Sequence, residues 1–153
     1  MTKQELLNHH KNVKNFIMSL NQLTDQEWQS PIAEGKWSIA EIVFHFIPWD
    51  LFIIESRLPF FRSNESLPSA PNVEKLNKTS AEKARLTSKE DTIKYFIETR
   101  TLLKNQIESL TDNECEIEIV LGTKKITIID YLSGMVEHDL HHISQVKEKM
   151  GFV

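Results

Sequence analysis

The sequence predicts an all-α protein, a four-helix bundle with a small β-hairpin between the third and fourth helices. Three observations lead to this prediction: long segments whose apolar residues recur with helical spacing, a capping signal at the start of each, and a short alternating segment before the last one. We expect the helices at residues 3–21, 38–62, 88–110 and 128–149. With 153 residues, 40% of them hydrophobic and 26% charged, the chain has the composition of a globular protein and the length of a single domain, residues 1–153.

Each predicted helix starts at a Ser or Thr that is followed three residues later by an acidic residue. In such a capping box the hydroxyl group accepts a hydrogen bond from the backbone of the third helical residue, and the acid reaches back to the backbone of the capping residue. The pairs are Thr2 with Glu5, Ser38 with Glu41, Ser88 with Asp91, and Thr127 with Asp130. A similar pair, Thr24 with Glu27, indicates a short turn of helix before the second long helix.

The hairpin is predicted from a change of period between the third and fourth helices. Residues 116–119 alternate between acidic and apolar side chains, residues 122–125 can form a turn, and Ile126 resumes the apolar pattern. We expect this hairpin to cap one end of the bundle.

The longest predicted connection runs from Ser63 to Thr87 and carries Pro68 and Pro71 among polar residues. A connection of this length is typical of a lid, a crossover or a disordered segment. At about 3.3 Å per residue it can run back along a whole helix, so the second and third helices can be parallel. The sequence therefore allows an up-down-down-up order of the helices.

Composition argues against several classes of partner. The formal net charge is −4, so the chain lacks the basic excess that binding to nucleic acid or an anionic membrane surface requires. The most apolar stretch, residues 39–54, is interrupted by polar residues and is too short to cross a bilayer. The single cysteine, Cys115, cannot form an internal disulfide, and residues 1–5 lack the apolar core of a signal peptide, so we expect a cytoplasmic protein.

Histidines are the main candidates for chemistry. His138 and His142 are four residues apart, so they lie on one face of the fourth helix, while His141 points to solvent. His45 lies at the edge of the apolar face of the second helix. Three imidazoles with an open fourth position are a recurring ligand set for catalytic zinc, and imidazole also suits nickel, copper and iron. The pattern predicts a site for a divalent metal, and the alternative is that these histidines are ordinary core or surface residues.

Several other polar residues fall on inner helix faces. Asp139 is expected within the apolar arc of the fourth helix, where it could orient a ligand histidine or act as a base. Asp50 and Arg57 are expected to form a buried pair, and the alternative is that Arg57 meets an anionic group of a substrate. His9 and His10 could approach the metal, but we expect them in a solvated first turn of helix.

Other reactive or bulky side chains are given structural roles. Cys115 is expected on the hairpin, where no neighbouring residue lowers its pKa, so we expect an inert thiol. Trp28, Trp37 and Trp49 are expected in the core and at junctions between elements.

These motifs together resemble those of the DinB-like superfamily of bacterial four-helix metalloenzymes, and are closest to its YfiT-like and bacillithiol-transferase-like branch. The resemblance extends from about Lys3 to Met150. The residues that carry it are the segment GKWSIAEI at 35–42 with His45, the segment DYL at 130–132, and the segment EHDLHHISQV at 137–146.

The resemblance implies an up-down-down-up bundle, frequent homodimers, and a divalent metal held by three histidines. Matched position by position, these ligands fall on His45, His138 and His142. The expected function is that of a metal-dependent enzyme acting on a small-molecule substrate, with zinc or nickel as the metal. The ion would activate either a low-molecular-weight thiol, as in an S-transferase, or water, as in a hydrolase. The segment 63–87 and Phe60-Phe61 are candidate walls of its pocket, and the alternative function is a non-catalytic helical dimer that binds a metal or small ligand.

Overall fold

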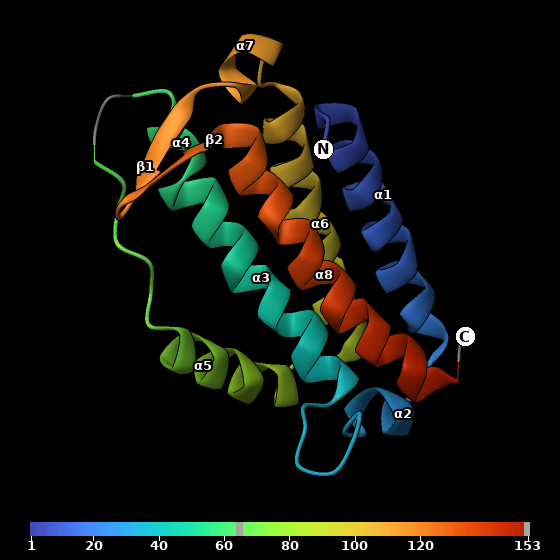
Figure 1. The fold of residues 1–153 in the computed structure, drawn as a ribbon. Helices are drawn as coiled ribbons and strands as arrows, with labels where there is room; N and C mark the ends of the chain where they lie inside the picture. Colours follow the sequence, from blue (N-terminus) through green and yellow to red (C-terminus); the bar gives the residue numbers. More distant parts are fainter. Residues whose placement is uncertain (64–65, 152–153) are drawn as a thin grey trace.

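The computed structural model describes residues 1–63 and 66–151. Its long helices are α1 (Lys3–Ser19), α3 (Ile39–Ser56), α6 (Lys89–Glu108) and α8 (Ile128–Met150), which pack side by side (Figure 1). In this view α1 and α8 run downward while α3 and α6 run upward, so α3 and α6 are parallel. The predicted all-α class and the up-down-down-up order are confirmed.

Shorter elements connect the long helices. They are a 3-10 turn η1 (Leu20–Gln22), α2 (Asp25–Gln29), α4 (Leu58–Phe61), α5 (Val73–Arg85), α7 (Asp112–Cys115), and the strands β1 (Glu118–Leu121) and β2 (Lys124–Thr127). The predicted second helix, 38–62, is therefore divided at Arg57 into α3 and α4. None of the helices in the described part of the chain has both the length and the apolar character needed to span a bilayer.

The predicted capping residues start every long helix. In each case the hydroxyl oxygen accepts a hydrogen bond from the backbone N–H three residues later. Glu5 and Glu41 also accept a hydrogen bond from the backbone N–H of their capping residue, which completes the box. The shorter side chains of Asp91 and Asp130 do not complete it.

The predicted hairpin is present between α6 and α8. β1 and β2 pair as antiparallel strands, with Leu121 opposite Lys124, and Gly122 in the turn has a positive φ of 63°. Such a conformation is common in two-residue hairpin turns and costs glycine little. Ile119 is buried in the core, so the hairpin closes the upper end of the bundle (Figure 1).

The connection from 63 to 87 differs from the prediction, because half of it is helical. Asn72 caps α5 by accepting a hydrogen bond from the backbone of Lys75, and the prolines stay in the extended part before it. The chain descends beside α3, and α5 packs against α3 near the lower end of the bundle (Figure 1). Residues 64–65 of this connection lie outside the described part of the chain.

The hydrophobic core has two clusters along the bundle axis. The upper cluster, toward the hairpin, includes Leu6, Ile53, Leu103 and Leu132. The lower cluster, toward α2, includes Val13, Trp28, Phe46, Phe96 and Ile143.

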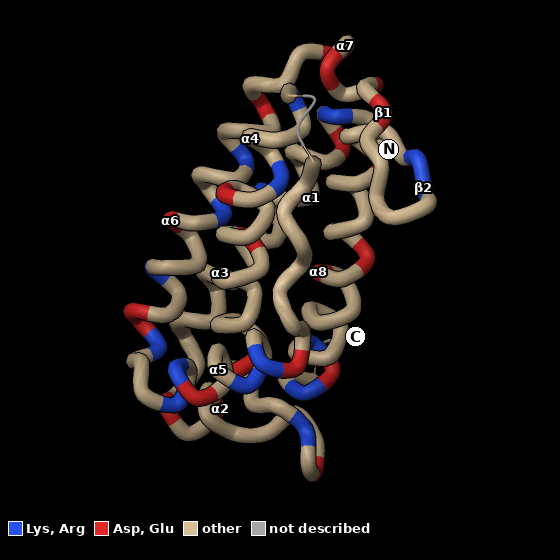
Figure 2. The backbone as a smooth tube through the Cα atoms, turned by 90° about the vertical axis from the view of Figure 1, so that its left-hand side faces the viewer, with Lys and Arg blue, Asp and Glu red and all other residues tan. Residues whose placement is uncertain are grey.

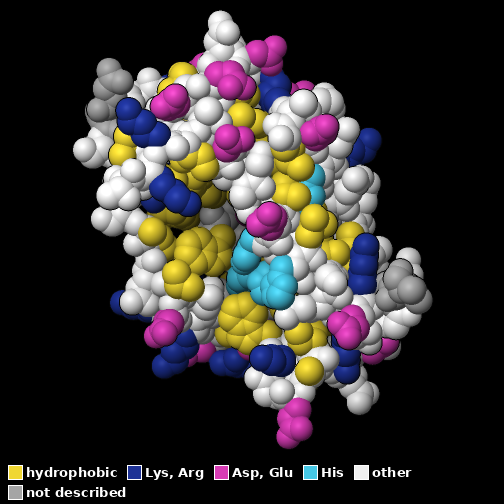
Figure 3. Space-filling model, in the orientation of Figure 1, with side chains coloured by type: hydrophobic (Ala, Val, Ile, Leu, Met, Phe, Trp, Pro, Cys, Tyr) yellow, Lys and Arg dark blue, Asp and Glu magenta, His cyan; other side chains and the backbone are white. Residues whose placement is uncertain are grey.

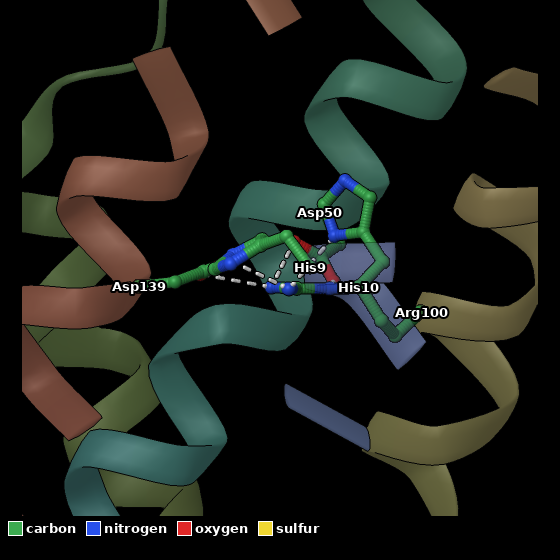
Figure 4. Close-up of polar contacts among 5 residues, drawn as sticks. All are labelled: His9, His10, Asp50, Arg100 and Asp139. Atoms are coloured by element: carbon green, nitrogen blue, oxygen red, sulfur yellow. Dashed lines mark hydrogen bonds and ion pairs between the residues drawn. The ribbon is translucent and has the colours of Figure 1, made fainter. Parts of the chain in front are cut away.

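A layer of buried polar residues separates the two clusters, and each long helix contributes to it (Figure 4). At its centre Arg100 of α6 is fully buried. Its Nε and Nη2 donate to Asp50 of α3 at 2.6 and 3.1 Å, and its Nη1 and Nη2 donate to Asp139 of α8 at 2.7 and 3.2 Å. From α1, the Nε2 of His9 lies 2.8 Å from Asp139, and the Nδ1 of His10 lies 3.3 Å from Arg100.

Two predictions about these residues are wrong. Asp50 pairs with Arg100 and not with Arg57, because the guanidinium of α6 enters the bundle between α3 and α8. His10 is fully buried instead of solvated, and His9 forms a hydrogen bond with Asp139. Burial, assisted by the charge of Arg100, lowers the pKa of His10 to about 3, so His10 is neutral at pH 7.

The carboxylates of the layer respond differently to their surroundings. Burial raises the pKa of Asp50 to about 6 in spite of its contact with Arg100. For Asp139, burial is outweighed by Arg100 and by the hydrogen bond to His9, and the pKa stays below its usual range. The ligand atoms of His9, His10 and Asp139 lie within 4.8 Å of one another, but the guanidinium touching two of these residues opposes a metal cation there.

We predict that Arg100→Met lowers the free energy of unfolding by about 3–5 kcal/mol, because it leaves two buried carboxylates without a counter-charge. Urea unfolding followed by circular dichroism measures this loss. Arg62→Met is the matched control, since Arg62 forms a partly exposed ion pair with Glu114 and should contribute under about 1 kcal/mol. An equally small effect of Arg100→Met would contradict the prediction.

Candidate metal centre

The structure brings together the three histidines that the sequence singles out. His45 lies on α3, and His138 and His142 lie one turn apart on the facing side of α8. One ring nitrogen of each lies within 4.8 Å of the others, and the two Nε2 atoms of His45 and His138 are 3.4 Å apart. Pro48 does not disturb this arrangement, since α3 continues through it to Ser56.

Hydrogen bonds on the outer side of two rings fix their orientation. The Nδ1 of His45 contacts the carbonyl oxygen of Ile42, and the Nδ1 of His142 lies 2.8 Å from Oε1 of Gln145. Because both partners are acceptors, each Nδ1 carries the proton and each Nε2 keeps a free lone pair. The ring nitrogens of His45 and His142 lie close to those of His138, and neutral imidazoles grouped in this way suit a divalent cation.

Burial keeps these imidazoles neutral. His45 is 1% exposed, and burial lowers its pKa to about 3 although the Ile42 carbonyl acts in the opposite direction. His142 is half-buried and His138 is exposed, and the pKa of each is lowered, mainly by partial burial. Neutral rings are the form that binds metal.

Trp37 covers the histidine triad, by which we mean His45, His138 and His142. Its ring lies 4.9 Å from the ring of His45 and stacks on that of His142 at 6.3 Å, measured between centroids. Histidine side chains reach the surface beside hydrophobic ones (Figure 3). The triad is thus covered on the side of His45 and accessible on the side of His138.

An apolar cavity of about 420 Å³ opens beside His138, and we call it the main cavity. This volume suits a small molecule. α5 closes one side of it, held to α3 by a hydrogen bond of 3.1 Å from the Trp49 indole to Asn77. Its apolar lining includes Phe46, Trp49, Ile53, Val73, Tyr131 and Met135.

A smaller recess of about 220 Å³ lies on the other side of the triad. His142, Gln145 and Trp37 line it, together with Lys36 and Ile42. Each hollow therefore reaches one histidine of the triad, His138 in the main cavity and His142 in the recess. Both are lined mostly by apolar surface, and Lys36 gives the recess a charged side chain of a kind that the described lining of the main cavity lacks.

Lys, Arg, Asp and Glu residues occur along the helices and in the segments at both ends of the bundle (Figure 2). Within the described residues, the main cavity has no Lys or Arg in its lining, and Asp50 and Asp139 are the carboxylates that border it. Both of these carboxylates are bound to Arg100. The cavity therefore offers a mostly apolar surface next to His138, with its carboxylates held by Arg100.

Other predicted site residues lie elsewhere. Asp139 contacts Arg100 and His9, and among the described residues it makes no hydrogen bond to a ring of the triad. Phe60 and Phe61 line a separate cavity near the hairpin. Cys115 ends α7 instead of lying on a strand, and burial raises the pKa of its thiol.

The sequence analysis missed three residues that shape this region. Gln145 lies three residues after His142, a spacing that allows the observed contact. Arg100 occupies a core position between Phe96 and Leu103, which is a signal for a buried charge. Trp37 lies just before α3 and was expected only as a junction residue, and no local pattern indicates that it covers the triad.

Comparisons with known proteins agree with this architecture. The model of the DinB superfamily matches residues 9–146. A solved structure described as "YfiT from Bacillus subtilis is a probable metal-dependent hydrolase with an unusual four-helix bundle topology" is similar at a TM-score of 0.77 and 17% identity, over 99% of this chain and 89% of that chain.

A second similar structure is that of a mycothiol-dependent maleylpyruvate isomerase. The TM-score is 0.73 at 10% identity, and the match covers 95% of this chain but only 61% of the isomerase chain. A histidine-to-alanine mutant of that isomerase gives a TM-score of 0.72 at 9% identity. These likenesses concern the fold, and no curated protein sequence matches the chain. Because the family model spans most of its length, the chain belongs to the DinB superfamily.

Proposed function

We propose that this protein is a metal-dependent enzyme in which His45, His138 and His142 hold one divalent ion, zinc or nickel, and that it transfers a low-molecular-weight thiol to a small electrophile. The observation that carries the proposal is the convergence of three neutral imidazoles beside an apolar cavity. Two similar structures, a probable metal-dependent hydrolase and a mycothiol-dependent isomerase, support a metal and a thiol respectively.

A divalent ion held by three neutral ligands keeps its full charge and an open position, and so lowers the pKa of a thiol or water bound to it. The protein's own residues supply positioning. The Ile42 carbonyl and Gln145 keep two Nε2 lone pairs directed inward. Trp37 shields the rings from water on one side, and the apolar lining of the main cavity orients the electrophile.

Two hollows on either side of the triad favour transfer over hydrolysis. A transferase must bind two substrates next to the activating ion, whereas a hydrolase binds one substrate and water. The main cavity suits an apolar electrophile, and the smaller recess beside His142, with Lys36 and Gln145, suits a polar thiol. Hydrolysis is the second candidate, favoured by the likeness to YfiT.

The proposal takes residues 1–153 as one domain that works in the cytoplasm as a homodimer. Asp139 has a positioning role in it: through Arg100 it holds α8 against α3 and therefore supports the triad. The competing hypothesis is a non-catalytic dimer that binds a metal or small ligand, and the assays below separate the two.

We predict that alanine at His45, His138 or His142 weakens metal binding by at least about tenfold, because each removes one ligand. Metal content per chain, measured after equilibration with zinc or nickel, tests this. The matched control is His141→Ala, an exposed residue on the same helix, which should retain full metal. A His45→Ala protein with unchanged metal affinity would show that the assignment is wrong.

We predict that acid releases the metal between about pH 6 and 4. The pKa values of the three histidines lie below the unfolded value of about 6.5, so their neutral form contributes stability that is present above this pH and is lost as pH falls. The difference in thermal stability between metal-loaded and metal-free protein should be large at pH 8 and vanish near pH 4. Equal stability of both forms at pH 8 would contradict tight binding by the triad.

We predict thiol-dependent consumption of an electrophile, such as a haloarene or an epoxide, by the metal-loaded protein. Met135→Trp, which fills the main cavity, should reduce this activity at least about tenfold while the metal content stays unchanged. Cys115→Ser is the matched control and should retain activity. Thiol-independent cleavage of esters or amides would instead assign hydrolysis, and no turnover with either class would favour the non-catalytic dimer.

A further inference from the structure

Arg57 is a buried cation at the junction of α3 and α4. Its side chain is 6% exposed, and its guanidinium carbon lies 4.4 Å from the centre of the Phe52 ring. Nη1 donates to the carbonyl oxygens of Ser56 at 3.0 Å and Pro68 at 2.6 Å. Within the described part of the chain, the buried Nε has no hydrogen-bond partner.

Among the described residues, no carboxylate forms an ion pair with Arg57. Asp50, the partner expected from the sequence, is bound to Arg100. Glu118 is exposed on β1 and forms no ion pair with Arg57. The contrast with Arg100, which has two carboxylates, is informative, because a buried charge is costly unless it is paired. Because the described residues supply no counter-charge to Arg57, this arginine is a candidate to bind an anion from outside the chain.

A cavity of about 710 Å³ lies beside this arginine, and we call it the hairpin cavity. Its volume is in the range of small-molecule sites. Arg57 and Pro68, which are hydrogen-bonded to each other, both line it, and the other walls include Phe60, Leu67, Ile119 and Leu121. Arg62 also lines the cavity, but its Nε is paired with Glu114 at 2.6 Å and its side chain is 47% exposed.

We propose that Arg57 binds an oxyanion, a carboxylate or phosphate group of a small molecule, in the hairpin cavity. Guanidinium binds such groups through hydrogen bonds from its planar fork, and the backbone of the described residues engages only Nη1 of Arg57. Stacking on Phe52 keeps the planar group in place. This binding site is distinct from the histidine triad and does not depend on a metal, although Arg57 neighbours Tyr131, which lines the main cavity.

Calorimetric titration of the full chain with succinate and with inorganic phosphate tests the proposal, with neutral succinamide as the control ligand. We expect saturable binding of at least one anion and none of succinamide. The relative affinities of succinate and phosphate assign the ligand as a carboxylate or a phosphate. The His142→Ala protein should bind the anion with unchanged affinity, which separates this site from binding at the triad.

Substitutions of Arg57 test whether this residue binds the anion. Arg57→Gln should weaken anion binding at least about tenfold, and Arg57→Lys, which keeps the charge but not the planar fork, should also weaken it. Arg62→Gln is the matched control at the same cavity and should stay within about threefold of the wild type. If Arg57→Gln does not fold, the test rests on Arg57→Lys: weaker anion binding by this variant supports the proposal, and unchanged binding contradicts it.

Three results would overturn the proposal. The first is the absence of saturable binding of both anions to the wild type. The second is equal weakening by the Arg57 and Arg62 variants. The third concerns Glu65, which lies outside the described residues: if Glu65→Gln binds an anion and the wild type does not, the chain's own carboxylate is the partner of Arg57.

Discussion

The bundle depends on one buried arginine that must satisfy two carboxylates. Arg100 enters from α6 and binds Asp50 of α3 and Asp139 of α8 through a planar fork of donors that fits carboxylate acceptors. Any sliding or rotation of one helix relative to the others would break a charged hydrogen bond in a region that water does not reach. Hydrophobic clusters above and below hold the helices together but tolerate small shifts, since apolar contacts have little directionality. The polar layer therefore selects one register among the many that the apolar faces alone would allow.

The same layer determines the geometry of the histidine triad. Asp139 directly follows His138 on α8, and Asp50 lies five residues after His45 on α3. Because Asp50 and Asp139 bind the same guanidinium, the distance between α3 and α8 is fixed near the triad. There the Nε2 atoms of His45 and His138 are 3.4 Å apart. α1 also contributes, since its residue His9 forms a hydrogen bond with Asp139, the carboxylate that Arg100 binds. Each long helix thus takes part in positioning three imidazoles that belong to only two of them.

Local patterns in the sequence were sufficient for the helices, their capping residues, the hairpin and the pair His138 and His142, because these features depend on spacing along the chain. His45 was grouped with this pair through its place at an apolar helix edge and through the family resemblance. Contacts between distant segments were not predictable in this way. Asp50 is seven residues from Arg57 and fifty from Arg100, and only the packing of α6 against α3 decides between these partners. The helix α5 was missed because Pro68 and Pro71 dominate the composition of its segment, although Asn72 is a good capping residue. Trp37 was missed as a neighbour of the triad, since its contact forms across a helix junction, whereas the contact of Gln145 with His142 is local and its spacing of three residues allows it.

The parallel arrangement of α3 and α6 requires the chain to return along the full length of the bundle between them. That return passage supplies α5 and with it a wall of the main cavity, while the histidines and the arginine layer come from the long helices. Val73 and Asn77 are the residues that α5 contributes to this wall, and they lie outside the long helices that carry the histidines and the rest of the lining. Replacement of residues facing the cavity from α5 leaves the register of the four long helices untouched. A bundle with this connectivity can acquire new ligand preferences by changes in one surface segment, without rebuilding its core.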